Sequence, residues 1–384
     1  MQDFVRWIEI DLDAIIHNFT EIRQLVPEPV QIMSVVKADA YGHGGIEVSK
    51  ALAEAGSDMF AVTTVEEGLE LVQAGIRQPV LVFAPMLPFQ AELILESGLI
   101  PTVDSLDAFQ ALAAQSEKRG TGARFHLKVE TGMGRTGIRP EEIAPLIAHM
   151  HRHPQVVMAG IYSHFATAMM KDKSFAHKQL ALFLKIIDEL KKENINIGLA
   201  HMANSAAVLD LPEAHLDMVR VGTLLYGQYP SVHVKRKVRL HDPWQMKARV
   251  VSVKKLSPGQ SVGYGRDYLV KKPMTVGVVP VGYADGFGVL PHTRPAKVYD
   301  LVKSTAKIFS HLMGVAPANY LTWGEEHLPV VGRIGMQLSM IDISGLNISA
   351  GAEVQVPLRR TTSSARIPRV YLKNGKVYKI RTIL

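Results

Sequence analysis

The feature that most constrains the fold of this chain is a regular alternation of short apolar segments with amphipathic segments between residues 30 and 225. Short runs rich in Val, Ile and Phe indicate buried strands, and the segments between them show helical periodicity. Eight apolar segments occur, at residues 31–37, 59–65, 79–85, 99–105, 124–130, 156–165, 197–203 and 216–222. Eight strands that alternate with helices predict a (β/α)8 TIM barrel.

The helices expected between these strands are best defined at residues 44–56, 105–120 and 178–194. The competing interpretation is a doubly wound open sheet. Such a sheet needs fewer strands and often carries a glycine-rich nucleotide-binding turn after its first strand. No such turn follows residues 31–37, so the barrel is favoured.

The pattern changes after residue 241. Apolar segments then follow one another with few helices, separated by turn signals such as "SPGQ" and "KNGK", at residues 247–256, 275–284, 329–336, 339–344 and 352–358. This half predicts a mostly antiparallel β domain with one inserted helix near 296–313. A chain of 384 residues is long enough for two domains. We expect a barrel domain at 1–238, with a first strand at about 5–12 able to pair with the second domain, and a β-rich domain at 239–384.

Composition excludes several classes of site. The chain has no cysteine, which excludes disulfides, thiolate catalysis and cysteine-ligated metals, and no metal site is expected. It has no apolar run long enough to span a bilayer, and its first segment contains acidic residues and no cleavage pattern. We therefore expect a cytoplasmic protein without a membrane partner.

The net charge of +7 raises the possibility of nucleic-acid binding. The one dense basic run, His233–His241, is not interleaved with aromatic residues. A solvated surface or linker is therefore the favoured interpretation, and no nucleic-acid partner is expected.

Polar residues gather where the predicted barrel strands end, the face on which barrel enzymes build their sites. Each has a structural alternative: an exposed lysine at Lys37, a buried ion pair at Arg220 or a core histidine at His164. Together, cationic and hydrogen-bonding residues at one mouth suit an anionic, phosphorylated ligand, and a lysine there can form a Schiff base with an aldehyde. The candidates are Lys37, Lys128, Arg135, His164, His201, Asn204, Ser205, Arg220, Gly222 and Thr223.

A resemblance makes these candidates specific. The segment "VVKADAYGHG" at residues 35–44 resembles the pyridoxal-phosphate lysine motif of alanine racemases. Eight further segments resemble that family in the same order: "HLKVETGMGRTG", "IYSHFATA", "HMANSAA", "VRVGTLLYG", "VGYGR", "VGYADG", "VVGRIGM" and "RIPRVY". The resemblance implies a fold type III enzyme that uses pyridoxal 5'-phosphate, acts on a small amino acid and forms a head-to-tail homodimer with shared active sites.

The resemblance also assigns roles residue by residue. Lys37 would bind the cofactor covalently, Arg220 would face its pyridine nitrogen and His164 would pack against its ring. The phosphate would be held by Tyr41, Ser205 and the backbone amides of Gly222 and Thr223, with Asn204 at the same cofactor site. Arg135 and the amide of Met336 would bind the substrate carboxylate, and Lys128 stands where the family often carries a carbamylated lysine.

Racemisation of L- and D-alanine removes the α-proton from one face and returns it on the other, so it needs two bases. The resemblance assigns these roles to Lys37 and to Tyr264 of the partner subunit. Free tyrosine and lysine have pKa values of about 10 and 10.4, so both need cationic or desolvating surroundings near neutral pH. Arg220 would leave the pyridine ring neutral, because arginine does not give up its proton in proteins. A neutral ring is a weaker electron sink, which disfavours side reactions.

The chain departs from the family at Glu130, where aspartate is usual, and at Met169, Gln337, Leu338 and Ala365. Ala365 stands where some members carry a tyrosine, and Met169 and Gln337 replace acidic residues. These changes predict a substrate range that extends to larger uncharged amino acids such as serine. A racemase for serine, lysine or ornithine is the main alternative. A non-catalytic cofactor carrier would lack the β domain, and a decarboxylase of this fold type would carry a catalytic cysteine.

Overall fold

The computed structural model describes residues 4–289, 305 and 319–382, which form two compact units. One unit is Asp11–Pro243, and the other comprises the described residues of Met1–Ile10 and Trp244–Leu384. Residues 239–243 thus pack with the first unit, and the first strand belongs to the second. Apart from Thr305, the insertion expected near 296–313 lies outside the described residues.

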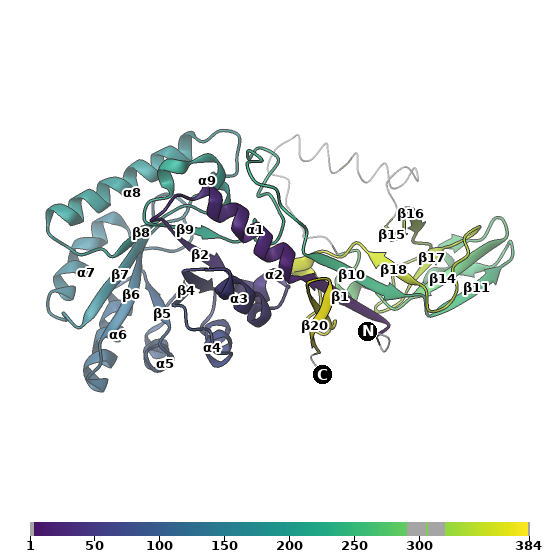
Figure 1. Ribbon diagram of the computed structural model, residues 1–384, viewed down its shortest axis with the longest axis horizontal. Helices are drawn as coiled ribbons and strands as arrows, with labels where there is room; N and C mark the ends of the chain where they lie inside the picture. The colour runs from purple at the N-terminus through teal and green to yellow at the C-terminus, as the bar shows by residue number, and fades with distance from the viewer. Residues whose placement is uncertain (1–3, 290–304, 306–318, 383–384) are drawn as a thin grey trace. The chain divides into compact units, whose positions relative to one another are not determined.

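The unit Asp11–Pro243 contains a closed barrel of eight parallel strands, which confirms the predicted fold (Figure 1). The last strand pairs with the first, with Arg220 beside Met33. Most of the strands end a few residues before the end of the predicted segment, whereas β4 ends with its segment at Pro85. The strands are β2 Gln31–Val35, β3 Met59–Val62, β4 Val80–Pro85, β5 Ile100–Val103, β6 Ala123–Lys128, β7 Val156–Tyr162, β8 Leu199–His201 and β9 Met218–Val221.

The longer helices surround the barrel because each turns an apolar stripe toward the strands. Side-chain caps fix where several begin: the Asp11 carboxylate accepts from the amides of Asp13 and Ala14, and Ser105 accepts from that of Ala108. Within the described residues, no helix is both long and apolar enough to cross a membrane. The helices are α1 Leu12–Leu25, α2 Lys37–Tyr41, α3 Gly45–Glu54, α4 Val65–Gln73, α5 Ala91–Ser97, α6 Leu106–Arg119, α7 Ile143–Met150, α8 Ser174–Lys192 and α9 Ser205–Asp210.

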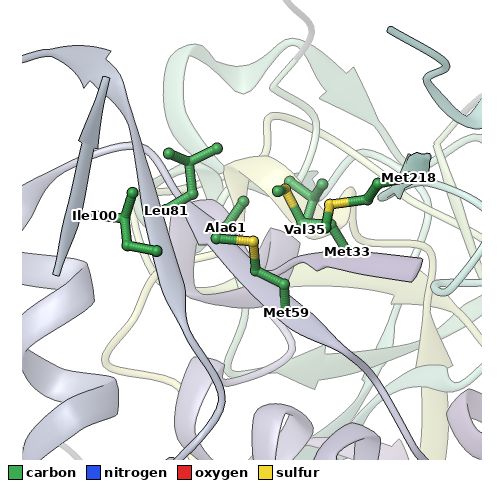
Figure 2. Packing of buried hydrophobic residues seen from close by; sticks show 7 residues of the cluster. All are labelled: Met33, Val35, Met59, Ala61, Leu81, Ile100 and Met218. Carbon is green, nitrogen blue, oxygen red and sulfur yellow. The ribbon is translucent and has the colours of Figure 1, made fainter. Parts of the chain in front are cut away.

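A buried apolar cluster fills the barrel across its first four strands and its last. Burying side chains of this size stabilises the fold by about 1.5–3 kcal/mol each. Met218 belongs to this cluster, and Arg220 lies two residues further along β9, so both side chains face the barrel interior. The apolar cluster therefore lies under the polar strand ends. Figure 2 shows its members, Met33, Val35, Met59, Ala61, Leu81, Ile100 and Met218.

The second unit is built from β-sheets, as predicted for the C-terminal half. A seven-stranded sheet has the order β16-β15-β18-β10-β1-β19-β20, beside a three-stranded sheet β11-β14-β17 and a two-stranded sheet β12-β13. The pairs β1–β10, β10–β18, β11–β14 and β14–β17 are antiparallel. The strands are β1 Arg6–Asp11, β10 Trp244–Arg249, β11 Ser252–Leu256, β12 Ser261–Val262, β13 Tyr268–Leu269, β14 Met274–Val279, β15 Tyr320–Trp323, β16 Glu326–Pro329, β17 Ser339–Asp342, β18 Glu353–Val356, β19 Arg369–Lys373 and β20 Lys376–Arg381.

Two strand predictions in this half were wrong. Residues 247–256 form two strands in different sheets: the amide of Val250 donates to Ala352, whereas that of Val251 donates to Val278. The chain crosses between sheets at this point. Residues 329–336 lie mostly outside any strand: β16 ends at Pro329, and Gly332 has a φ of 70°, a conformation that interrupts an extended strand.

Candidate active site

A cavity of about 560 Å³ opens at the carboxyl ends of the barrel strands. Ten residues predicted for the site line it, and they lie in or shortly after five of the eight strands, β2, β6, β7, β8 and β9. Among its lining residues in the described chain, four are cationic and none is a carboxylate, so the cavity favours an anionic ligand. The ten are Lys37, Tyr41, Lys128, Arg135, His164, Asn204, Ser205, Arg220, Gly222 and Thr223.

Lys37 enters the cavity from the end of β2. Burial, together with repulsion from Arg135, lowers the pKa of Lys37, and the carboxylate of Glu67 opposes this shift. Its amine is thus deprotonated more readily than that of an exposed lysine. The four residues that follow, 38–41, all have φ between 52° and 54°, a left-handed conformation that L-residues rarely adopt.

Tyr41 and Gly222 form a narrow polar end of the cavity. Burial raises the pKa of Tyr41 to about 12, so its hydroxyl stays protonated and can donate a hydrogen bond. A β-carbon on Gly222 would lie 2.6 Å from the Tyr41 Oη, so any larger residue here would force the Tyr41 hydroxyl to move. The Gly222 amide donates to Ser205 Oγ at 3.0 Å, and Asn204 caps the helix that begins at Ser205. Hydroxyls and amides gathered in this way can hold a phosphate.

Arg220 lies at the bottom of the cavity and is almost fully buried. It donates hydrogen bonds to the carbonyls of Ser163, His201 and Met202 and to Nδ1 of both His164 and His201, at 2.7–3.1 Å. Burial lowers the pKa of Arg220 to about 10, which leaves the guanidinium charged at neutral pH. These carbonyls fix its position, so one cation faces the interior of the site.

The arginine also sets the protonation of two buried imidazoles. His201 accepts from Arg220 at Nδ1, so its proton is on Nε2, which donates to His126 Nδ1 at 2.8 Å. Burial lowers the pKa of His126 to about 3 and that of His201 well below its ordinary value, so both are neutral near pH 7. His164 is kept neutral in the same way, by burial and by the neighbouring Arg220.

Lys128 and Arg135 enter from β6 and the loop after it. Lys128 is buried and donates to the Thr136 hydroxyl. Burial, and then repulsion from Arg135 and Arg220, lowers the pKa of Lys128 to about 8. Near neutral pH it therefore has a larger fraction of free amine than an ordinary lysine.

The loop that carries Arg135 is organised by Glu130. The Glu130 carboxylate accepts hydrogen bonds from the amides of Gly132, Met133 and Gly134. Burial alone would raise the pKa of Glu130, but these bonds and one from the Arg135 amide outweigh it and hold the pKa below its ordinary value. A charged carboxylate thus fixes the backbone that places Arg135 at the cavity.

Sequence reasoning missed several lining residues. Tyr162 is fully buried, stacks on His201 with 4.9 Å between ring centroids, and shares a 2.7 Å hydrogen bond with Thr102. Phe83 and Thr136 also line the cavity. Two of these residues could have been identified by their place in the sequence. Tyr162 is the last residue of β7, two residues before His164, and Thr136 directly follows Arg135.

The remaining candidates belong to the unit that contains Trp244–Leu384. Tyr264 and Met336 are 79% and 60% exposed there, and Ala365, Gln337 and Leu338 are exposed too. Tyr264 stands between Gly263 and Gly265, which have φ of 75° and 72°. Of the family departures, Met169 lines the cavity and is 46% exposed.

Comparison with known proteins gives one consistent family. Residues 10–230 match the model described as alanine racemase, N-terminal domain, and residues 244–368 match alanine racemase, C-terminal domain. Alanine racemase 1 of Caldanaerobacter subterraneus is 38% identical over 96% of this chain and 95% of its own length. A solved alanine racemase of Clostridium difficile superimposes with a TM-score of 0.88 at 31% identity, covering 99% of this chain and 98% of that one. The alanine racemase of Bacillus anthracis, solved with bound L-Ala-P, has a TM-score of 0.85 at 28% identity. The match covers 98% of this chain and 97% of that one.

Proposed function

The chain belongs to the alanine racemase family, and from this premise we propose that it interconverts L- and D-alanine with pyridoxal 5'-phosphate as cofactor. The observation that carries the proposal is one cavity in which Lys37 lies among cationic side chains, hydroxyls and backbone amides, with no carboxylate among the described lining residues. We place the activity in the cytoplasm, as expected for an enzyme of amino-acid metabolism without cysteine.

The residues present fit this cofactor. A phosphate is suited to the end where Tyr41, Ser205, Asn204 and the amides of Gly222 and Thr223 gather, since a β-carbon on Gly222 would take up the space beside the Tyr41 hydroxyl. Arg220 and His164 are suited to the ring, and Lys37 to covalent attachment. When bound, pyridoxal phosphate supplies an electron sink that stabilises the carbanion left by loss of the α-proton.

In this proposal two residues transfer the α-proton of the substrate, one on each face. Lys37 takes or returns the α-proton at Nζ on one face of the substrate, and its lowered pKa makes the free amine accessible. Tyr264 of the partner subunit acts on the other face. The 79% exposure of Tyr264 within its own chain supports a homodimer in which it completes a neighbouring site.

The substrate carboxylate is bound by Arg135 and by the amide of Met336. The loop bonds of Glu130 support a fixed Arg135. A carbamate on Lys128 would replace a cation by an anion able to orient Arg135. The pKa of about 8 favours this modification, because carbon dioxide reacts with the neutral amine.

A panel of L-amino acids tests the proposal. The protein loaded with pyridoxal phosphate is incubated with L-alanine, L-serine, L-lysine or L-ornithine, and D-enantiomer formation is followed by chiral chromatography. In D2O, racemised alanine should carry deuterium at the α-carbon. We expect the highest kcat/KM for alanine and no activity in Lys37→Ala. Formation of D-serine or D-lysine without D-alanine would make the alternative racemase the correct function, and no D-amino acid at all would refute both.

A further inference from the structure

The turn that follows Lys37 is a strained element. Ala38, Asp39, Ala40 and Tyr41 are consecutive non-glycine residues with φ of 52–54°. Each adopts a conformation in which the β-carbon of an L-residue crowds the backbone, and such residues persist only where their surroundings hold them. Both ends of the segment, Lys37 and Tyr41, line the cavity. The strain is thus tied to the placement of two site residues.

Most hydrogen bonds of this segment are local. The Ala40 amide donates to Val36 O at 2.7 Å, and the Gly42 amide to Ala38 O at 2.9 Å. The Asp39 carboxylate accepts from the Gly45 amide at 2.7 Å. The amide of Ala38, the first residue of the left-handed run, instead donates to Glu67 Oε1 at 2.5 Å, 29 residues further along the chain.

Glu67 is itself held rigidly. It lies in the first turn of α4, where its Oε2 accepts from the amides of Thr63 and Thr64 at 2.8 and 3.2 Å, while Thr64 Oγ1 accepts from the Glu67 amide at 3.3 Å. This reciprocal capping box fixes the carboxylate at the helix start. One carboxylate therefore joins the end of β3 to the segment after β2.

We propose that Glu67 is a positioning residue for Lys37 and Tyr41: its carboxylate holds the Ala38 amide and so maintains the left-handed turn that brings both side chains to the cavity. The bond has a charged acceptor, which makes it stronger than a neutral one. Glu67 also raises the pKa of Lys37, against the effect of burial. The role of the two positioned residues rests on the proposed function, but the geometry of the turn does not.

Glu67→Gln tests the proposal with little change in volume, and Glu66→Gln is its matched control. Glu66 precedes Glu67 in the same helical turn, and its side chain is exposed. Glutamine has one acceptor oxygen where Glu67 uses two, so either the Ala38 amide or the amides of Thr63 and Thr64 lose their partner, and any bond that remains has a neutral acceptor. Cofactor binding should therefore weaken, and kcat should fall about tenfold, in Glu67→Gln. The KM for alanine should change less than twofold, since Arg135 is untouched. In Glu66→Gln, the cofactor affinity, kcat and the KM for alanine should all stay within about twofold of wild type.

Rescue by glycine separates positioning from general stability. Ala38 is exposed, so Ala38→Gly opens no cavity and removes the β-carbon that disfavours positive φ. Adding Ala38→Gly to Glu67→Gln should therefore raise the cofactor affinity at least about threefold above that of Glu67→Gln alone, because the turn then needs less support. Ala114→Gly, at an exposed position inside α6, should recover nothing.

Amide hydrogen exchange on the cofactor-free protein completes the test and does not depend on racemase activity. A peptide covering residues 38–41 should exchange at least about tenfold faster in Glu67→Gln than in wild type or Glu66→Gln. If Glu67→Gln does not fold, Glu67→Asp, which draws the carboxylate back by one methylene, gives the same comparison. The proposal would be overturned if residues 38–41 exchanged at the wild-type rate in the Glu67 variant. It would also be overturned if Ala38→Gly recovered none of the lost cofactor affinity. A protein that neither binds the cofactor nor racemises alanine, yet shows the exchange difference, would instead refute only the proposed function.

Discussion

Gly222→Ala is the substitution whose effect on the cofactor site can be worked out most directly from the structure. The φ of Gly222 is not positive, so alanine meets no backbone penalty there. Its β-carbon would lie 2.6 Å from the Tyr41 Oη and 3.2 Å from Cζ. Ordinary contact begins at 3.4 Å, so the Tyr41 hydroxyl must retreat by 0.8 Å.

A retreat of this size removes the Tyr41 hydroxyl from hydrogen-bond distance of a phosphate held at this end. Losing one hydrogen bond to a charged group costs about 1.5–3 kcal/mol, which corresponds to a roughly 10- to 150-fold weaker affinity. Equilibrium titration of the cofactor-free protein with pyridoxal phosphate measures this change. We expect kcat at saturating cofactor to fall less than the affinity, because Lys37 and Arg220 are not displaced.

Tyr41→Phe provides the control. It removes the atom that would lie at 2.6 Å and leaves Cζ, at 3.2 Å, as the nearest contact. Gly222→Ala should therefore weaken cofactor binding at least about threefold less in the Tyr41→Phe background than in wild type. If Gly222→Ala bound pyridoxal phosphate with wild-type affinity, the reasoning about the phosphate end would be refuted. The same holds if Gly222→Ala lowered that affinity equally in the wild-type and Tyr41→Phe backgrounds.

Three further predictions concern the shared site, the buried lysine and the substrate range. Lys37→Ala and Tyr264→Phe should each be nearly inactive and should regain activity when subunits are exchanged, because one site of each mixed dimer has both bases; mixed dimers without activity would argue against a shared site. The Lys128 pKa of about 8 leaves about a tenth of its amine neutral at pH 7 and most of it neutral above pH 8. Treatment with 13C-bicarbonate should therefore label Lys128 increasingly over this range, as seen by 13C NMR, and not label Lys128→Met. Ala365→Tyr should lower the ratio of kcat/KM for serine to that for alanine; an unchanged ratio would mean that another side chain fills the space.

The barrel could be predicted from sequence because parallel strands buried on both faces are apolar along most of their length. Such strands end where polar residues begin, and this change marks Lys37 after β2 and Lys128 at the end of β6. Nine of the ten candidates found at strand ends consequently line one cavity, and the tenth, His201, is not among its lining residues. The signal is local, so it needs no knowledge of which strands pair.

Features that depend on distant partners could not be predicted. Val250 and Val251 continue an apolar run, and only their bonds to Ala352 and Val278 show that the chain changes sheets between them. Likewise, Glu67 has the sequence signature of an ordinary capping box. Its bond to Ala38 is long-range, and the left-handed segment it supports contains no glycine that would have marked it.

The most direct test of the central claim is to locate the cofactor on the chain. The protein is loaded with pyridoxal phosphate, reduced with borohydride, digested and mapped by mass spectrometry. A pyridoxyl group is expected on the peptide that contains Lys37. Lys128 is a built-in comparison, because it lines the same cavity and also has a lowered pKa. A pyridoxyl group on Lys128 or any other lysine, or on none, would contradict the account.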